Sequence, residues 1–240
     1  MEKVRLGRTN LVVSKLGWGG IPIQRANEQD AISVISAVGN MGVDLLDTAR
    51  GYTNSEYRIG LALHKIGRSI VLSTKSHVKS KKISEDVHKS LNQMRVKKIQ
   101  IYHTHNVSSL EEYEKVMAPG GAYEGLKLVQ KQGLIDFIGL SSHNLKVLEK
   151  VIEEGFFDVI MACYSFLEPE ADKRIFPLAK KKDIGVLVMK PFSGGVIEDS
   201  SLALKFVLSQ PGIVPIPGSE TLEKAKENWE VLKKRGSSPN

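Results

Sequence analysis

Four residues whose side chains suit proton transfer stand near the ends of three successive apolar runs. Asp47, Lys75 and His105 stand at or just after the ends of the runs 42–48, 69–74 and 98–104, and Tyr52 follows Asp47 by five residues. If these runs are neighbouring parallel strands, their carboxyl ends share one rim, and the four side chains meet there. Each residue alone is weak evidence, whereas four complementary groups at one rim predict an active site.

These residue types suit the reduction of a carbonyl group, in which a proton must reach the developing alkoxide. The Tyr52 phenol, with an ordinary pKa of about 10, can supply that proton if a neighbouring cation lowers its pKa. Lys75 can provide the charge, and Asp47 can keep Lys75 protonated and oriented. A neutral His105 can donate a hydrogen bond that positions the carbonyl oxygen. The set predicts an oxidoreductase with Tyr52 as its general acid.

The elements that must position these residues alternate along the chain. Short runs rich in Val, Ile and Leu are typical of parallel strands buried on both faces, and amphipathic segments separate them. Eight such units predict an α/β protein, a single-domain (β/α)8 TIM barrel over residues 1–233 with a short polar tail at 234–240. The strands are predicted at 11–17, 42–48, 69–74, 98–104, 135–141, 158–164, 184–189 and 212–216, and the helices at 28–41, 55–65, 84–94, 110–132, 145–154, 170–182, 201–209 and 221–233.

An open doubly wound sheet is the alternative fold for alternating strands and helices. That fold favours a Gly-x-Gly-x-x-Gly turn between its first strand and helix. The corresponding stretch here, Gly17-Trp18-Gly19-Gly20-Ile21-Pro22, lacks the spacing. The barrel is therefore the preferred prediction.

Composition narrows the function classes. Apolar residues make up 41% of the 240 residues, and no apolar run approaches the about 18–20 residues that span a bilayer. The N-terminus has no apolar signal-peptide core, so we expect a cytoplasmic protein without a membrane partner. The single cysteine, Cys163, excludes an internal disulfide and a cysteine-held metal or iron–sulfur cluster.

The net charge of +7 suits an anionic ligand such as a phosphorylated cofactor, or a non-specific attraction to nucleic acid. The lysines are scattered, mostly over the predicted helices, which indicates a solvated basic surface. We therefore expect no nucleic-acid partner and a small-molecule carbonyl substrate.

The sequence around Asp47 and Tyr52 resembles the first signature of the aldo-keto reductases, and further matches extend over nearly the whole chain. By that resemblance Tyr52 is the general acid, Asp47 and Lys75 tune it, and His105 orients the substrate carbonyl. The stretch Met189-Lys190-Pro191 resembles the branch that often carries a C-terminal iron–sulfur domain, which we expect to be absent here. The matching stretches are Val43-Asp44-Leu45-Leu46-Asp47-Thr48-Ala49-Arg50-Gly51-Tyr52, residues 6–14, 73–75, 139–143 and 216–219, and the pair Glu227-Asn228.

The same resemblance implies a nicotinamide dinucleotide extended across the rim, without a dinucleotide-binding domain of its own. Three groups of residues are implied in its binding, near the nicotinamide, the pyrophosphate and the adenosine. Lys224 stands where the family binds the 2′-phosphate, whereas Glu220 adds a negative charge nearby, so NADP(H) is favoured and NAD(H) is possible. The implied cofactor residues are Gly19, Gly20, Ser141 and Ser142, then Lys190, Phe192, Ser193 and Gly194, then Gly218, Ser219, Lys224 and Asn228.

Two other functions fit part of the pattern. His103 and His105 are two apart on a predicted strand and point the same way, as metal ligands of a hydrolase do. Hydrolases built on this barrel place such a pair on the first strand, so we expect a core position for His103 and no metal. A cofactor-binding redox-sensing or regulatory protein with slow turnover would keep the same site.

Overall fold

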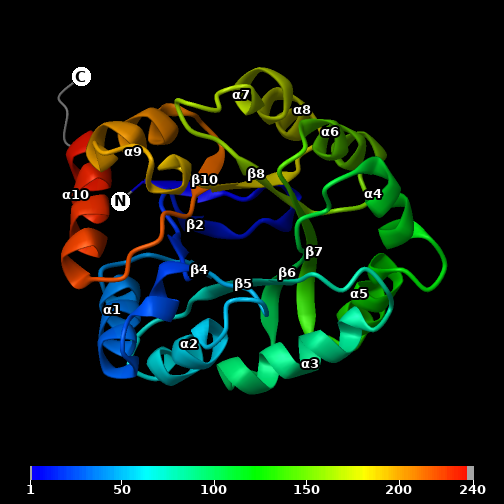
Figure 1. The fold of residues 1–240 in the computed structure, drawn as a ribbon, viewed down its shortest axis with the longest axis horizontal. Helices are drawn as coiled ribbons and strands as arrows, with labels where there is room; N and C mark the ends of the chain where they lie inside the picture. The colour runs from blue at the N-terminus through cyan, green and yellow to red at the C-terminus, as the bar shows by residue number, and fades with distance from the viewer. Residues whose placement is uncertain (1, 237–240) are drawn as a thin grey trace.

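Within residues 2–236, which the computed structural model describes, eight parallel strands form a ring in which each neighbours the next along the chain (Figure 1). Backbone hydrogen bonds from Gly17 N to Pro215 O (2.9 Å) and from Gly19 N to Pro217 O (3.1 Å) close the ring between its first and last strands. The predicted (β/α)8 barrel is confirmed. Its strands are β3 (Trp18–Gly19), β4 (Leu45–Asp47), β5 (Val71–Ser76), β6 (Ile99–Thr104), β7 (Ile135–Ser142), β8 (Val159–Cys163), β9 (Gly185–Met189) and β10 (Ile213–Pro215).

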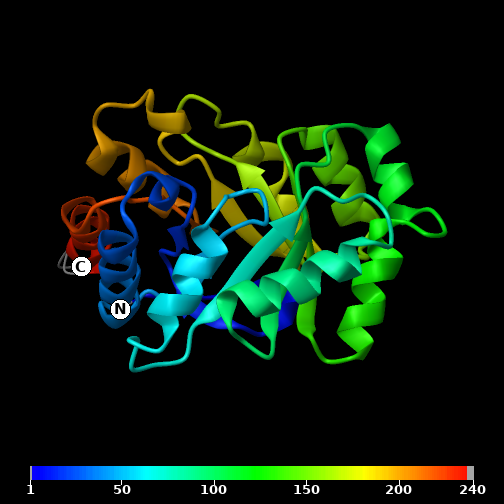
Figure 2. The same ribbon diagram turned by 60° about the horizontal axis from the view of Figure 1, so that its bottom comes forward.

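Helices surround the ring on its outside (Figures 1 and 2). Two predicted helices are each divided in the structure, at residues 118–121, which read Ala-Pro-Gly-Gly, and at Ile175, just before Pro177. Proline has no N–H to donate within a helix, so each division follows from the local sequence. The helices are α1 (Glu28–Asn40), α2 (Ser55–Leu63), α3 (Ile83–Met94), α4 (Leu110–Met117), α5 (Ala122–Lys131), α6 (Leu145–Glu154), α7 (Ala171–Arg174), α8 (Phe176–Lys181), α9 (Ser200–Ser209) and α10 (Leu222–Gly236), with 3-10 turns η1 (Gly7–Thr9), η2 (Pro22–Arg25) and η3 (Ser193–Gly195).

The C-terminal helix extends beyond the expected limit of the barrel. Helix α10 runs past residue 233 to Gly236, and residues 237–240 of the expected polar tail lie outside the described residues.

None of the helices in the described part of the chain combines the length and the apolar character that a membrane crossing requires.

The first predicted strand, 11–17, is wrong as a barrel strand. Val12–Ser14 (β2) instead pairs antiparallel with Lys3–Arg5 (β1) in an N-terminal hairpin, and the first barrel strand is the two-residue β3. Leu6 and Val13 of this hairpin region are fully buried and belong to the core cluster inside the barrel. Within the predicted run, Val13 belongs to the inner core, whereas Val12 is exposed and Leu16 packs in the outer layer.

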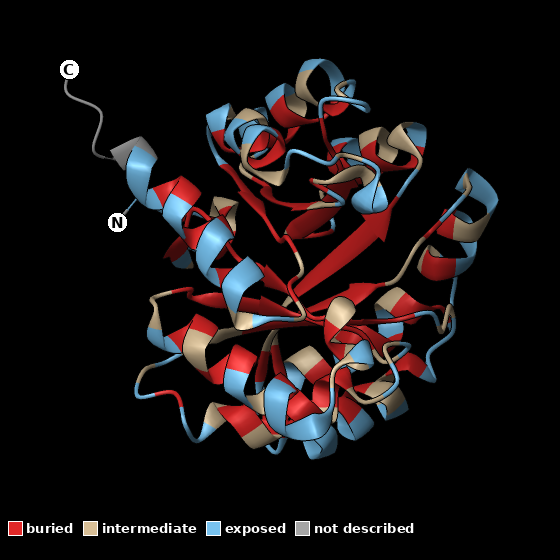
Figure 3. Ribbon diagram, turned by 60° about the vertical axis from the view of Figure 1, so that its left-hand side comes forward, coloured by how far each residue is buried: buried red, intermediate tan, exposed pale blue. Residues whose placement is uncertain are grey.

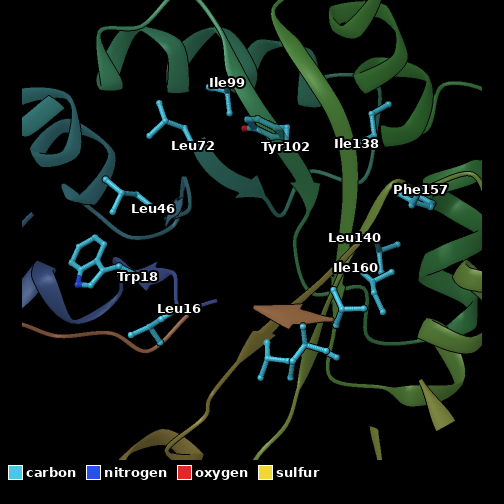
Figure 4. Close-up of a cluster of buried hydrophobic side chains, with 14 of the residues drawn as sticks. Leu16, Trp18, Leu46, Leu72, Ile99, Tyr102, Ile138, Leu140, Phe157 and Ile160 are labelled. Atoms are coloured by element: carbon cyan, nitrogen blue, oxygen red, sulfur yellow. The ribbon is translucent and has the colours of Figure 1, made fainter. Parts of the chain in front are cut away.

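Apolar side chains form two layers, one inside the strands and one between the strands and helices. Leu45 and Ile101 belong to the inner cluster. Leu46 and Tyr102, one residue later, belong to the outer cluster (Figure 4). The strands of the barrel are largely buried, whereas the helices carry both buried and exposed residues (Figure 3). Successive side chains of a strand point to opposite faces. Residues two positions after an inner residue, such as Asp47 after Leu45, therefore point into the barrel as well.

The hairpin region makes a stability prediction. Leu6→Ala should lower the free energy of unfolding by about 2–5 kcal/mol, because it removes a fully buried side chain from the inner core. Val12→Ala, at a side chain in the same hairpin that is 59% exposed, should change it by no more than about 0.5 kcal/mol. Urea denaturation measures both, and equal effects would show that the hairpin does not fill the barrel.

Candidate active site

The structure brings the four predicted catalytic side chains together at the carboxyl ends of β4 to β6. The Lys75 ammonium lies 2.5 Å from Asp47 Oδ2 and 5.1 Å from the centre of the Tyr52 ring. The Tyr52 and His105 rings meet edge to face, with centres 5.9 Å apart. A phenol, an ammonium and an imidazole are thus brought close together at one rim.

Strand register and one tight loop place these groups. Asp47 pairs with Ser73 across β4 and β5, so Lys75 stands one inward position above Asp47. The loop after β4 is tied to β5 by a hydrogen bond from Arg50 N to Lys75 O (2.9 Å), and Ser55 N donates to Tyr52 O (2.7 Å) where α2 begins. Tyr52 is therefore held over the strand ends by backbone contacts on both sides.

The Asp47–Lys75 pair is almost wholly buried, with side-chain exposures of 3% and 2%. The ammonium also donates to Thr48 O (2.8 Å), and Asp47 Oδ1 accepts from the Ser73 hydroxyl (2.7 Å). Burial raises the pKa of Asp47, and the nearby ammonium and the Ser73 hydroxyl act against that rise. Each charge has its opposite and further polar partners, which is the condition for a stable buried ion pair.

The pKa of Tyr52 differs from the expectation. Burial raises its pKa above the ordinary value of 10.0, and this effect exceeds the lowering by the charge of Lys75 and by a hydrogen bond from it. The phenol is consequently protonated at neutral pH. The cation is in the expected place, but the low polarity around the ring has the larger effect.

His105 is a neutral imidazole in this site. Burial, followed by the positive charges of Lys75 and other neighbours, lowers its pKa to about 2. Its Nδ1 is buried without a hydrogen-bond partner among the described residues. A buried lone pair without a partner costs less than a buried N–H without one, so the proton belongs on Nε2, where it can be donated.

Sequence reasoning missed two residues that hold His105. The His77 ring stacks on the His105 ring with centres 3.9 Å apart, and the Lys79 ammonium donates to the His105 carbonyl. Burial lowers the pKa of Lys79 to about 8. A signal was present, because His77 and Lys79 follow Lys75 at steps of two, the spacing of one face of an extended chain.

His103 lies fully buried inside the barrel, as expected for a core histidine, and its Nε2 is 3.1 Å from the Ser73 hydroxyl. Within residues 2–236, no group of three or more His, Cys, Asp or Glu side chains is arranged to hold a metal ion. Of the two histidines, His103 packs in the core of the barrel and His105 stands at the rim beside Tyr52.

Gly19 and Gly20 are required by packing within the protein. A Cβ at Gly19 would lie 2.6 Å from Ile216 O, where the barrel closes, and a Cβ at Gly20 would lie 2.6 Å from the Ser55 hydroxyl. Gly20 N donates to Asp47 O (2.8 Å), which ties this loop to the site. These glycines therefore position the wall beside Asp47, whatever else they contact.

Ser141 and Ser142, the last two residues of β7, differ in what they can offer a ligand. Ser141 accepts a hydrogen bond from Asn106 N (2.8 Å), and no described residue takes the proton of its hydroxyl. Ser142 donates to Val107 O (2.6 Å) and accepts from Asn144 N (2.9 Å), so its hydroxyl is already used. Only Ser141 keeps a donor for a bound molecule.

The loop after β9 has an unusual backbone. Lys190, Ser193 and Gly194 have φ angles of 55°, 48° and 72°, in the left-handed region that disfavours side chains. Lys190 is exposed, Phe192 is half-buried against the outer core, and the hydroxyls of Ser193 and Ser165 are 2.7 Å apart. A cation thus stands beside a sharply turned segment at the rim.

The residues expected to bind the adenosine end lie on α10 and in the loop before it, some of them packed at the barrel closure and one exposed. Gly218 packs beside Gly19 at the barrel closure, the Ser219 hydroxyl accepts from the Trp18 indole (2.9 Å), and Asn228 is buried. Lys224 is exposed, and it forms an ion pair with Glu220 (2.9 Å).

Arg25, which sequence reasoning missed, contacts the same carboxylate from η2. Its guanidinium lies 2.8 Å from Glu220 Oε2, so Glu220 stands between two cations. The pair joins residues 195 positions apart, and nothing in the local sequence marks it.

The fold and the site together define a (β/α)8-barrel protein with a tyrosine, a lysine, an aspartate and a histidine at the carboxyl rim. Residues 14–201 match the model of the aldo/keto reductase family. Because that match covers well over half of the chain, the protein belongs to this family.

Several known proteins are similar to this chain, and the solved structures among them share its fold. An NADH-specific methylglyoxal reductase of Escherichia coli (strain K12) is 28% identical over 228 residues, covering 82% of this chain and 69% of that protein. Among solved structures, the holo form of an aldo-keto reductase from Bacillus halodurans superposes with a TM-score of 0.83 at 23% identity, over 100% of this chain and 92% of that one. A Klebsiella pneumoniae aldo/keto reductase in complex with NADP and acetate gives 0.80 at 18% identity, over 96% and 89%.

The buried ion pair makes a second stability prediction. Asp47→Asn should lower the free energy of unfolding by about 3–5 kcal/mol, because it leaves the Lys75 ammonium buried without a counter-ion. Glu111→Gln removes one member of an exposed Lys–Glu pair and should cost no more than about 0.5 kcal/mol. Urea denaturation of the two variants provides the comparison, and a mild Asp47→Asn variant would mean that the pair contributes no more than a surface contact.

Proposed function

We propose that this protein reduces aldehyde or ketone carbonyls with a nicotinamide cofactor, and that Tyr52 is the general acid. The observation that carries the proposal is the meeting of a protonated phenol, a buried ammonium and a neutral imidazole at one rim, with the Tyr52 ring centre 5.1 Å from the ammonium and 5.9 Å from the imidazole centre. Membership of the aldo/keto reductase family and the similarity to a protein named as a methylglyoxal reductase support carbonyl compounds as substrates.

Each residue has a distinct task in this reaction. The Tyr52 hydroxyl donates its proton to the carbonyl oxygen as negative charge develops there. The Lys75 ammonium, held by Asp47 and Thr48 O, stabilises the phenolate that remains. His105 Nε2–H donates a hydrogen bond to the same oxygen and fixes its direction. These groups are arranged before the substrate arrives, so little reorganisation opposes the reaction.

The chain also offers groups that fit a nicotinamide dinucleotide. The free donor of Ser141 suits a carboxamide oxygen, and Lys190 with the left-handed turn at Ser193 and Gly194 suits a pyrophosphate. When bound, the cofactor supplies the hydrogen and electron pair that the carbonyl carbon takes up. A related solved structure named as a complex with NADP supports this class of cofactor.

Tyr52→Phe tests the central role. We expect its reduction rate to fall by about 10²-fold or more, because a general acid is lost, while the dissociation constant of the cofactor stays nearly unchanged. Steady-state oxidation of NADPH or NADH with small aldehydes measures the first quantity, and fluorescence titration measures the second. A fully active Tyr52→Phe enzyme would place the proton donor elsewhere. Cofactor binding without turnover in the wild type would instead support the redox-sensing function.

For the choice of cofactor we propose that NADP(H) is favoured and NAD(H) is accepted. Arg25 and Lys224 carry two positive charges and Glu220 one negative charge, so the cluster retains one net positive charge for a 2′-phosphate. The carboxylate between them can accept hydrogen bonds from an unphosphorylated ribose. A related protein named as NADH-specific shows that the preference within such relatives is not fixed.

Glu220→Gln should therefore raise the ratio of kcat/KM for NADPH over NADH by about tenfold, because it frees two cations for the phosphate. Lys224→Ala should lower the same ratio. Glu230→Gln, which breaks an exposed Lys–Glu pair farther along α10, should leave it unchanged. Steady-state kinetics with both cofactors provide the ratio. If neither the Glu220 nor the Lys224 variant changes this ratio, the 2′-phosphate does not bind here.

A further inference from the structure

A buried chain of hydrogen bonds continues from the ion pair down into the barrel. Asp47 Oδ1 accepts from the Ser73 hydroxyl at 2.7 Å, and the Ser73 oxygen is 3.1 Å from His103 Nε2. Ser73 and His103 are fully buried, and Asp47 is 2% exposed. None of the roles proposed above uses Ser73 or His103, although together they occupy the polar layer directly beneath the site.

Counting donors fixes the direction of this chain. Asp47 is the counter-ion of Lys75, so its carboxylate only accepts hydrogen bonds. The Ser73 hydroxyl has one proton, and that proton goes to Asp47. The contact between Ser73 and His103 must then be an N–H of the imidazole donating to the Ser73 oxygen. His103 therefore carries its proton on Nε2.

The other imidazole nitrogen leads to the same tautomer. His103 Nδ1 is buried and has no hydrogen-bond partner among the described residues. A proton placed there would leave a buried donor unsatisfied, whereas a bare lone pair costs less. Burial, with the nearby charge of Lys75, lowers the pKa of His103 to about 3, so the ring carries a single proton at neutral pH.

The absence of a side chain at Gly139 leaves room for the His103 ring. His103 pairs with Gly139 across β6 and β7, and a Cβ on Gly139 would lie 2.1 Å from His103 Nδ1. The ring therefore lies across the bare backbone of Gly139, which holds Nε2 toward Ser73. A residue with any side chain at this position would push the imidazole out of the chain.

We propose that His103 and Ser73 are positioning residues, which orient the Asp47 carboxylate through the chain His103 Nε2–H to Ser73 O–H to Asp47 Oδ1. With Oδ1 held by Ser73, Oδ2 faces Lys75, and the ammonium is directed at Thr48 O and Tyr52. Loss of either donor leaves a buried carboxylate oxygen or hydroxyl oxygen unsatisfied and lets the pair rotate. The effect on the reaction rests on the function proposed above, whereas the tautomer does not.

The tautomer is measured first, on the wild-type protein labelled with ¹⁵N-histidine. Long-range ¹H–¹⁵N correlation distinguishes Nε2–H from Nδ1–H by the cross-peak pattern of each ring, and a His103→Gln variant identifies the signals that belong to His103. We expect Nε2–H, with no titration of this ring between about pH 5 and 9. A proton on Nδ1, or a ring that titrates in this interval, would overturn the inference while leaving the role of Tyr52 untouched.

Two substitutions at His103 test the direction of the hydrogen bond in the reaction. The amide of His103→Gln reaches about as far as Nε2, whereas that of His103→Asn reaches only as far as Nδ1. We expect His103→Gln to keep kcat within about twofold and His103→Asn to lower it about tenfold, the scale of one lost hydrogen bond to a charged network. KM and the dissociation constant of the cofactor should not move. Equal activity of the two variants would contradict the proposal.

Substitutions of serine give a test that leaves the histidine intact. Ser73→Ala should lower kcat about tenfold at constant KM, because Asp47 loses a donor. Ser90→Ala is the control, since Ser90 is equally buried but bonds Tyr102 on the outer face of the barrel (3.2 Å). A Ser73→Ala variant with the kcat of Ser90→Ala would overturn the positioning role. A Tyr52→Phe enzyme that is fully active would instead refute the proposed function, whatever the serine variants do.

Discussion

The Asp47 carboxylate and the Lys75 ammonium lie 2.5 Å apart inside the barrel, and both side chains are almost wholly buried. The surrounding residues supply the further hydrogen bonds that two buried charges need. Burying an ion pair costs more than its attraction returns unless further polar groups complete it. Thr48 O and the Ser73 hydroxyl do so here, and the loop that carries Tyr52 is tied to the backbone of Lys75. Tyr52 is thus tied to the strand that carries one member of the buried pair.

Much of the barrel could be predicted because buried parallel strands leave a direct signal in apolar runs. Seven predicted strands correspond to β4 through β10, with shifts of a few residues at their ends. The first strand could not be predicted, because β3 has two residues and the stronger apolar run nearby belongs to a hairpin, of which Val4 and Val13 reach the inner core. Which surface an apolar run covers is decided by tertiary packing, and its sequence pattern is the same in either case.

The meeting of the four candidate catalytic side chains could be predicted, because a barrel brings consecutive strand ends to one rim. Their environment could not. The rise in the pKa of Tyr52, the stacking of His77 on His105 and the ion pair of Arg25 with Glu220 depend on burial and on contacts between distant loops. Lys224 shows the difference well: its position on α10 was predictable, but the carboxylate that shares its charge also binds a residue of η2. The sequence identifies the chemical groups of the site, and the fold determines which of their hydrogen-bonding atoms and charges are already paired within the protein.

The inside of the barrel is asymmetric, and this asymmetry accounts for the unusual protonation of the site. On β5 and β6 the inward positions change from apolar to polar toward the rim, as in the step from Ile101 to His103. On β8 and β9 they stay apolar, with Met161 and Leu187 in the inner core. Water does not compete for the hydrogen bonds of polar groups that are buried beside apolar side chains, so each group is stabilised mainly by its neighbours in the cluster. Burial and the positive charge of Lys75 keep His105 neutral, with a pKa of about 2, and the buried N–H of His103 acts through Ser73 on the ion pair beside Tyr52.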